Sequence, residues 1–372
     1  MRVLFLTSRD WLDPNACGGD FCTTDYARYL AGRGHEVTLL AARYLGSARE
    51  QTLEGVRIVR PGGIFFLALW ALAYYVRHRK AFDVVYEEGM ASVRLPFLAP
   101  LYVRRPLVAM WYQVNAPIFS EQYPRPLAWL LTLAERLVLT LHRHSVMLTL
   151  SSDRKQELVA LGFRPEQVTV TPPLMLDSRP TEVPDPPREP LIVWLGKIRR
   201  YKCAHHAVEA MPDVVRQVPQ ARLVIAGRRD DEGYEAELLS LAERLGVKDA
   251  VQVIVDISDA EKWDLLARAQ AFVVTSPVEG FGIVIVEANR CGTPIVATEG
   301  VPLETARDGY NGFRLPFGDR QALAAALVRL LSNRPLFDAL SRNARQHAEQ
   351  FSLAQTGRNF EETLAATTAR AA

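Results

Sequence analysis

The chain has 372 residues, of which 49% are hydrophobic and 23% are charged, and its formal net charge is +2 at pH 7. This length is too great for one ordinary hydrophobic core and predicts two domains of about 150 to 200 residues each. The small net charge excludes a strong basic field, so we expect no nucleic-acid partner.

Short β-rich runs alternate with helical patterns through the first half of the chain, which predicts parallel βαβ units. The strand candidates are Val3–Thr7, Glu36–Leu40, Val56–Arg60, Val84–Tyr86, Leu107–Met110 and Val146–Leu150. Because the first of these runs begins next to Met1, it leaves no room for a signal peptide. The four cysteines show neither a C-x-x-C pair nor a four-ligand set completed by a histidine pair. We therefore expect a reduced, cytoplasmic protein without a metal site.

The longest apolar run, Ile64 to Val76, is followed by Arg77, His78, Arg79 and Lys80. It is shorter than the roughly 20 residues that a membrane-spanning helix needs. A core helix whose last turn carries cations is the favoured interpretation. A helix lying on an anionic membrane is the alternative, so peripheral contact with the inner face of the membrane stays open.

Seven prolines lie between Thr171 and Pro190, and they exclude both a helix and a central strand there. The alternation restarts with strand candidates at Leu191–Leu195, Leu223–Ala226, Val251–Val255, Phe272–Thr275 and Ile295–Ala297, and helical patterns at Gln321–Leu331, Pro335–Gln350 and Leu353–Ala366. The predicted fold is α/β, with two doubly wound Rossmann-like domains facing a cleft. We place the domains at residues 1–175 and 188–351, with a C-terminal helix within 352–372 packing back on the first.

Two carboxylates, Glu279 and Glu287, lie eight residues apart around a glycine-rich turn between a predicted strand and a predicted helix. The backbone amides of Gly280, Phe281, Gly282 and Ile283 are then free at the helix start, where a phosphate group can accept their hydrogen bonds. Two acceptor carboxylates beside such an anion site predict binding of a phosphorylated sugar.

A basic loop follows the first strand of the second domain. Gly196 allows a tight turn, and Lys197 and Lys202 place two ammonium groups where a diphosphate can be neutralised. Both this loop and the Glu279 turn follow strands of one parallel sheet, so we expect them to face the same crevice.

The motif set resembles the retaining nucleotide-sugar glycosyltransferases of the GT-B fold, family 4, also described as glycosyl transferases group 1. The matching stretches are Cys17-Gly18-Gly19-Asp20, Arg33-Gly34-His35-Glu36-Val37, Gly196-Lys197 with Lys202, Glu279 to Glu287, Gly300-Val301-Pro302 and Asp308-Gly309-Tyr310-Asn311-Gly312. The family has arginine where this chain has Lys197. Arginine can donate two parallel hydrogen bonds to a phosphate group, whereas lysine is a point charge.

The resemblance implies a donor site of ten residues: Gly18, Gly19, Gly196, Lys197, Lys202, Glu279, Phe281, Gly282, Ile283 and Glu287. It implies that Glu287 accepts hydrogen bonds from the ribose, that Glu279 accepts them from the transferred sugar, and that Lys197 and Lys202 hold the phosphates. Glu279, Lys202 and Lys197 form the predicted catalytic group. No Asp-x-Asp motif lies near these loops, so we expect no metal and no cofactor beyond the nucleotide-sugar co-substrate.

The segment Val108 to Pro126 departs from the family, since many members have a histidine there and this chain has Gln113 and Asn115. Neither amide transfers protons at neutral pH. The aromatic residues of this segment form either a stacking surface for the acceptor or part of the hydrophobic core; they are Trp111, Tyr112, Phe119 and Tyr123.

The resemblance implies a retaining glycosyltransferase, hexosyl or other, that moves a sugar from a nucleoside-diphosphate sugar to an acceptor hydroxyl without a metal. It also implies that the first domain, 1–175, is the acceptor side and that the second, 188–351, binds the nucleotide-sugar donor. The acceptor is a glycan, a lipid-linked sugar or a small molecule. The rivals are a nucleotide-sugar epimerase, a sugar phosphorylase, and a catalytically degenerate sugar-nucleotide-binding protein.

Overall fold

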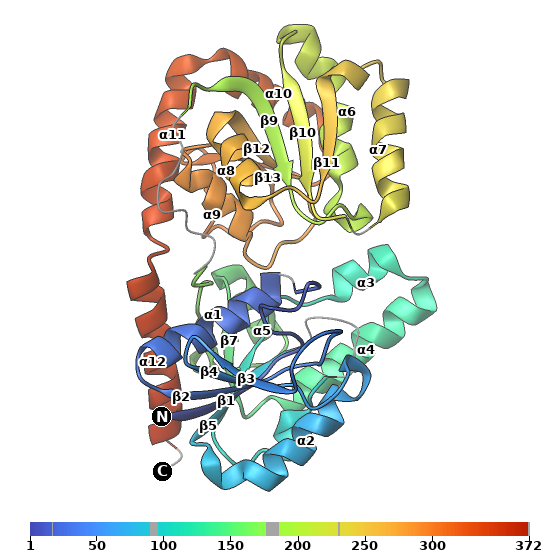
Figure 1. Ribbon diagram of the computed structural model, residues 1–372. Coiled ribbons are helices and arrows are strands. Elements are labelled where there is room, and N and C mark those ends of the chain that lie inside the picture. The colour runs from blue at the N-terminus through green and yellow to red at the C-terminus, as the bar shows by residue number, and fades with distance from the viewer. Residues whose placement is uncertain (17, 90–95, 176–185, 230, 371–372) are drawn as a thin grey trace. The chain divides into compact units, whose positions relative to one another are not determined.

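A computed structural model describes residues 1 to 370 except residues 17, 90–95, 176–185 and 230. The chain divides into two compact units (Figure 1). Unit 1 comprises Met1–Leu176 and Ser352–Ala372, and unit 2 comprises Asp177–Phe351. The centre of the predicted proline-rich linker, 176–185, lies outside the described residues.

Unit 1 contains an eight-stranded sheet in the order β3-β4-β2-β1-β5-β6-β7-β8. Its strands are β1 Arg2–Leu6, β2 Glu36–Leu40, β3 Glu50–Leu53, β4 Val56–Val59, β5 Val84–Glu88, β6 Leu107–Met110, β7 Val146–Thr149 and β8 Val168–Val170. All neighbours pair in parallel except β3 and β4, which pair antiparallel. The sequence did not predict β3 or β8, which are the two edge strands.

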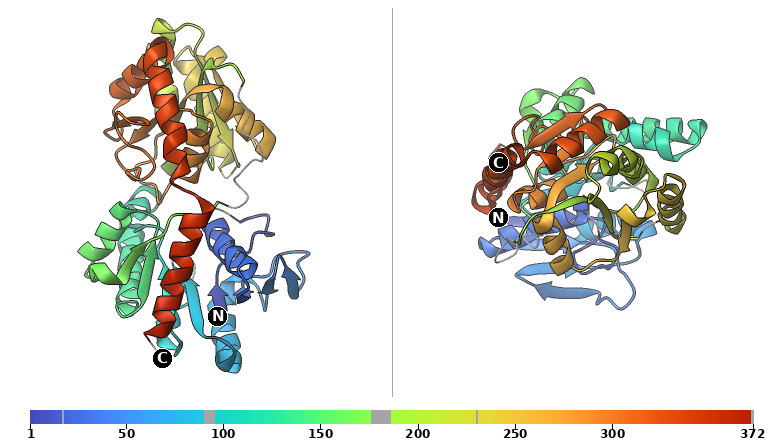
Figure 2. Two further views of the ribbon diagram at one scale, coloured as in Figure 1. Left: turned by 90° about the vertical axis from the view of Figure 1, so that its left-hand side faces the viewer. Right: turned by 90° about the horizontal axis from the view of Figure 1, so that it is seen from above.

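The unit 1 helices are α1 Gly18–Gly32, α2 Leu67–His78, α3 Ala116–Gln122, α4 Arg125–Leu141, α5 Ser152–Ala160 and α12 Leu353–Ala369. The last helix contacts α1, β5 and β6, and lies along the unit 1 sheet in the left view of Figure 2. Its Phe360 is fully buried and stacks on Tyr26 of α1 with ring centroids 4.1 Å apart. Unit 1 is therefore built from both ends of the chain.

The apolar run near residue 70 forms a single helical turn, η1 Ile64–Phe66, and then α2. Only Leu67, Ala71 and Tyr75 of α2 are buried, whereas Phe65 of η1 is 78% exposed and Leu69 of α2 is 62% exposed. The favoured prediction of a core helix thus holds for one side of α2 and is wrong for the other, which presents large apolar side chains to solvent.

Unit 2 contains a six-stranded parallel sheet in the order β11-β10-β9-β12-β13-β14. Its strands are β9 Glu189–Leu195, β10 Arg222–Gly227, β11 Val251–Val255, β12 Ala269–Val274, β13 Ile295–Thr298 and β14 Gly312–Leu315. Only β14 was not predicted. The central strands read as nearly continuous apolar runs because helices cover both faces of a parallel sheet.

The unit 2 helices are α6 Ala204–Gln217, α7 Glu232–Arg244, α8 Asp259–Arg268, α9 Ile283–Arg290, α10 Arg320–Ser332 and α11 Arg334–Glu349. One buried cluster joins α6, α7 and α10 to the sheet, and a second joins α8 and α9 to it. The helices therefore lie on two faces, as doubly wound folds require. Within the described residues, no helix combines the length and the apolar character needed to cross a bilayer.

Candidate functional site

The structure brings Lys202 and Glu279 together. Lys202 follows β9 in the turn η5 Arg200–Lys202, and Glu279 lies in the loop after β12, which is the strand next to β9. The Nζ atom of Lys202 donates to Oε1 of Glu279 at 2.5 Å, and the hydroxyl of Ser276 donates to the same oxygen at 2.6 Å. The basic loop and the acidic motif therefore meet at the carboxyl end of this sheet.

A buried threonine fixes the position of the Lys202 backbone. The hydroxyl of Thr275 donates to the carbonyl oxygen of Lys202 at 2.9 Å and accepts from the indole nitrogen of Trp194 at 3.1 Å. These bonds tie the end of β9 to the end of β12, so the ammonium group is held by its own backbone as well as by Glu279.

The ion pair is mostly shielded from water, since the side chains of Lys202 and Glu279 are 19% and 15% exposed. Burial lowers the pKa of Lys202, but the charge of Glu279, the interaction with Tyr201 and the hydrogen bond to Glu279 together outweigh this and leave the pKa above its usual value. The amine is consequently charged at neutral pH.

Glu287 lies on α9 and points into the protein, where it is only 2% exposed. It pairs with Lys262 of α8 at 3.0 Å. Burial lowers the pKa of Lys262, whereas the Glu287 carboxylate raises it, and the net shift is upward. Glu287 is therefore not a solvated helix residue. The sequence analysis missed Lys262, although it is one of only six lysines in the chain.

The glycine-rich turn before α9 has the backbone geometry of an anion site. Gly282 caps the helix with a φ of +84°, and a Cβ at this position would lie 2.5 Å from Cδ1 of Ile285. No acceptor in the described part of the chain takes the amides of residues 280–283. Phe281 is 2% exposed and its ring packs against Phe351, so its side chain anchors the turn.

Gly196 and Lys197 lie directly after β9, where the chain passes close to β10. A Cβ at Gly227, the last residue of β10, would lie 1.9 Å from the carbonyl oxygen of Gly196. The amide of Gly196 donates to Ala226 at 3.1 Å. Lys197 is half-buried at this crossing. The close approach explains the glycine at position 227, whereas a Cβ at position 196 would lie 3.3 Å from the Trp194 ring.

In unit 1, Gly18 and Gly19 open helix α1. The hydroxyl of Tyr112 donates to the carbonyl oxygen of Gly19 at 2.7 Å, and a Cβ at Gly19 would lie 2.9 Å from the tyrosine ring. A Cβ at Gly18 would meet nothing within 4 Å. Gly19 is therefore required for packing against Tyr112, and Gly18 is not.

A buried acid lies beside this helix start and was not predicted. Glu88, at the end of β5, accepts from the Thr7 hydroxyl at 2.7 Å and the Ser8 amide at 2.8 Å. Within the described residues its other oxygen, Oε1, has no hydrogen-bond partner. Burial, followed by the charge of Asp20, raises the pKa of Glu88 to about 8.

Several side chains of the segment Val108 to Pro126, which departs from the family, hold the structure of unit 1 together. Asn115 donates through its backbone and side-chain nitrogens to the buried carboxylate of Glu135, at 2.9 Å and 2.8 Å. The side chain of Gln113 donates to Asn115 at 3.4 Å. Trp111 and Phe119 are buried and belong to the core, whereas Tyr112 and Tyr123 are half-buried.

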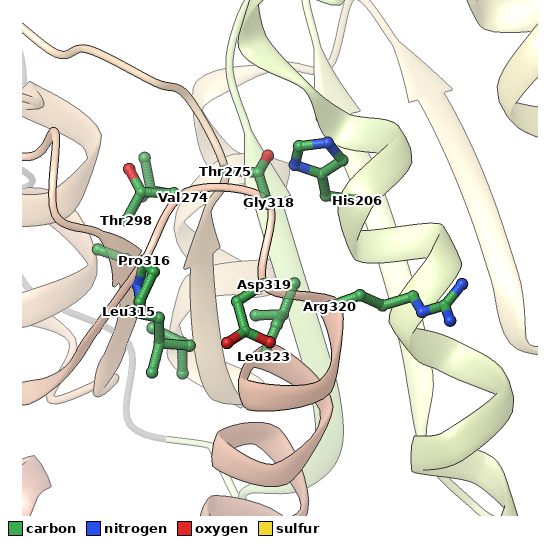
Figure 3. A pocket seen from close by; sticks show the side chains of 12 residues that line it. His206, Val274, Thr275, Thr298, Leu315, Pro316, Gly318, Asp319, Arg320 and Leu323 are labelled. Carbon is green, nitrogen blue, oxygen red and sulfur yellow. The ribbon is translucent and has the colours of Figure 1, made fainter.

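A pocket opens at the carboxyl ends of β12 and β13, beside the start of α10 (Figure 3). His206, Thr275, Thr298 and Asp319 are among its polar lining residues. None of the predicted donor residues lines it, and Thr275 links it to the Lys202 backbone. This pocket is a neighbour of the Lys202–Glu279 pair rather than the predicted site itself.

Three possible metal ligands also lie close to Lys202. Ligand atoms of Cys203, His205 and His206 fall within 4.8 Å of one another. The sequence predicted no metal site because its cysteines and histidines complete no set of four ligands, which is the number that a structural zinc site uses. Nδ1 of His205 is already hydrogen-bonded to the hydroxyl of Tyr234 at 2.8 Å.

Two family models match the chain in succession. Residues 18–174 match the model described as Glycosyltransferase Family 4, and residues 179–347 match the one described as Glycosyl transferases group 1. Together they cover most of both units. The chain belongs to the group 1 glycosyltransferases.

Relatives of this group 1 glycosyltransferase include two enzymes named D-inositol 3-phosphate glycosyltransferase. The one from Streptomyces bingchenggensis is 28% identical over 298 residues, covering 74% of this chain and 64% of the relative. The one from Segniliparus rotundus is 31% identical over 169 residues, covering 45% and 37%. The matched part thus spans less than two thirds of either relative.

Solved structures confirm the predicted fold class. Sucrose-phosphate synthase from Thermosynechococcus elongatus superposes with a TM-score of 0.79 at 19% identity, covering 98% of this chain and 99% of the other. Anabaena HepE, in complex with UDP and glucose, superposes with a TM-score of 0.76 at 20% identity, covering 98% and 100%. This group 1 glycosyltransferase therefore has the GT-B fold of two Rossmann-like domains.

Proposed function

We propose that this protein is a glycosyltransferase that moves a sugar from a nucleoside-diphosphate sugar to an acceptor hydroxyl. The observation that carries the proposal is the Lys202–Glu279 pair at the carboxyl ends of β9 and β12. It lies at the sheet edge where open α/β folds bind ligands. The family to which the chain belongs supports the same reaction class.

Different residues of unit 2 bind different parts of the donor. Glu287 accepts hydrogen bonds from the ribose, and Lys262 holds that carboxylate in place through their ion pair at 3.0 Å. Glu279 accepts hydrogen bonds from the sugar hydroxyls. Lys202, Lys197 and the amides of residues 280–283 bind the diphosphate, because cations and free N–H groups both favour anions.

For the helix start in unit 1, Gly18 and Gly19 keep the role that the family resemblance implies, which is to let the backbone approach the diphosphate. Tyr112 orients the carbonyl of Gly19 and thereby holds the first turn of α1 in place.

We infer transfer with retention of anomeric configuration. The bond between the anomeric carbon and the diphosphate oxygen breaks, the acceptor oxygen bonds to the same face of that carbon, and the acceptor proton passes to the departing diphosphate. Lys202 and Lys197 stabilise the charge that develops on the leaving group, which is the task that a metal performs elsewhere. Glu279 and Glu287 act as binding groups, so the acid and nucleophile pair of glycosidases does not apply.

A catalytically degenerate binding protein is the rival that one observation favours. The chain has no histidine between His78 and His142, where many family members carry one. Release of free nucleoside diphosphate from a donor and an acceptor separates a transferase from a binding protein. Conversion of the donor alone indicates an epimerase, and conversion that requires phosphate indicates a phosphorylase.

Donor binding is tested by thermal unfolding with a panel of nucleoside diphosphates and their sugars, including UDP and UDP-glucose. At least one should raise the Tm by roughly 5 °C at a concentration about one hundred times its Kd. Glu287→Ala should abolish that shift, whereas Glu362→Ala on the exposed side of α12 should preserve it. A full shift in the Glu287 variant would remove the ribose role, and no shift with any nucleotide would remove the proposed function.

A further inference from the structure

Two neighbouring parts of unit 1 expose large apolar side chains that the proposed reaction does not use. We define the α2–α4 surface by ten such residues: Phe65 and Phe66 of η1, Leu69, Trp70 and Val76 of α2, and Leu127, Trp129, Leu130, Leu133 and Leu137 of α4. Trp129 is 67% exposed and Phe65 is 78% exposed. Exposed apolar patches of this extent mark interaction sites.

Both helices cover the same face of the unit 1 sheet. The core under α2 includes Val85 of β5, and the core under α4 includes Ala109 of β6. Val85 pairs with Leu107 in parallel register, and residues 107 and 109 of β6 point to one face because side chains alternate along a strand. Helix α12 packs on the opposite face, where Phe360 contacts Tyr86.

The charges around the α2–α4 surface are basic. Arg77, Arg79 and Lys80 follow the apolar part of α2, and all three are exposed. Helix α2 contains no acidic residue. The single acidic residue of α4, Glu135, is buried and accepts hydrogen bonds from Asn115. The charged side chains that α2 and α4 expose are thus cationic, and Glu50, an acid near His78 of α2, is paired with Arg57 at 2.6 Å.

We propose that the α2–α4 surface docks this protein onto an anionic lipid bilayer. Exposed Trp, Phe and Leu with flanking Arg and Lys are the composition of helices that lie in the membrane interface. Cationic side chains add attraction to anionic headgroups. A second copy of the chain fits less well, because a twofold interface sets the same basic patches against each other.

Docking through unit 1 also specifies the acceptor, and this step rests on the proposed function. Unit 1 contains the segment that matches Glycosyltransferase Family 4, which the family resemblance identifies as the acceptor side. A bilayer held against that unit supplies acceptors from its own surface. The acceptor class is therefore a lipid-linked sugar or a glycolipid.

Binding is tested by flotation of the full-length protein with phosphatidylcholine vesicles and with vesicles containing phosphatidylglycerol as well. We expect at least tenfold more bound protein on the anionic vesicles, and less bound protein as the salt concentration rises. Equal binding to both lipids, or none to either, would overturn the proposal. A protein that instead forms a concentration-dependent dimer through this surface would also overturn it.

Intrinsic fluorescence locates the contact, because Trp70 and Trp129 lie on the surface while Trp111, Trp194 and Trp263 are buried. Anionic vesicles should shift the emission to shorter wavelength. The double variant W70F/W129F should lose most of that shift. If this variant keeps the full shift, the α2–α4 surface is not the contact.

The double variant L130E/L133E should reduce vesicle binding at least tenfold, whereas Leu239→Glu on α7 of unit 2, where Leu239 is 46% exposed, should not. Nucleotide-dependent thermal shifts keep the two proposals separable. A variant that loses vesicle binding and keeps the nucleotide shift supports docking alone. If no nucleotide binds while the vesicle contact persists, the proposed function fails and the docking surface stands.

Discussion

The ion pair between Glu287 and Lys262 lies largely inside unit 2, and its contribution to stability can be measured. Lys262→Met keeps the aliphatic stem but leaves the Glu287 carboxylate, 2% exposed, without its cation. We expect a loss of about 1 to 3 kcal/mol in unfolding free energy, below the range for fully buried pairs because Lys262 is 18% exposed. Urea unfolding measures this loss. Lys262→Arg should retain most of the wild-type unfolding free energy. An unchanged unfolding free energy in Lys262→Met would contradict the pairing.

The carboxyl group of Glu88 gives unit 1 a pH dependence of known sign. Because burial raises its pKa from 4.5 to about 8, the folded state binds a proton more tightly than the unfolded state. Stability is therefore greatest below the unfolded pKa and falls as the pH rises toward 8. Between pH 5 and pH 8, the unfolding free energy of the wild type should fall by a few kcal/mol more than that of the Glu88→Gln variant. Parallel pH profiles of the two proteins would contradict this assignment.

At the level of elements, alanine substitutions of the two glycines at the start of α1 should affect stability differently. Gly18→Ala meets open space and should leave unfolding free energy within about 0.5 kcal/mol of the wild type. Gly19→Ala forces its methyl group against the Tyr112 ring and should cost about 1 to 3 kcal/mol. Thermal unfolding of the pair checks this. Equal effects would show that the first turn of α1 tolerates both changes.

The apolar central strands were predictable because burial on both faces of a parallel sheet produces continuous apolar runs. Strands β2, β6 and β11 have the predicted bounds. The edge strands β3 and β14 were missed, since Glu50–Leu53 has only one apolar residue and Gly312–Leu315 begins with a glycine. Hydrogen bonding to a single neighbour, and not sequence pattern, defines these strands.

The candidate site was predictable only where its residues share a motif. The spacing from Glu279 to Glu287 and the loop from Gly196 to Lys202 were visible in the sequence. Lys262 was not, because its link to Glu287 arises from the packing of α8 against α9. Glu88 was also missed, since a carboxylate at a strand end is usually solvated and its burial depends on neighbouring elements.

At the scale of the whole molecule, the return of the chain to unit 1 makes α12 part of that unit's core. Phe360→Ala should cost about 3 to 5 kcal/mol by leaving a cavity against Tyr26. Because unit 2 lacks this contact, the nucleotide-dependent thermal shift should persist. Calorimetry with and without nucleotide measures both effects, and Glu362→Ala on the exposed side of α12 is the control. An unchanged Tm for unit 1 would show that α12 is dispensable.

The path of the backbone also sets an order for folding during synthesis. Residues 177–351 form unit 2 without interruption, so this unit has its complete sequence before Phe360 of α12 is synthesised. The 1–176 segment of unit 1 precedes unit 2 in the sequence but lacks Phe360 until α12 has been synthesised, and the aromatic surface of Tyr26 and Tyr86 stays open to water until then. Of the two units, unit 1 begins earlier in the sequence and is consequently the later one to complete its core.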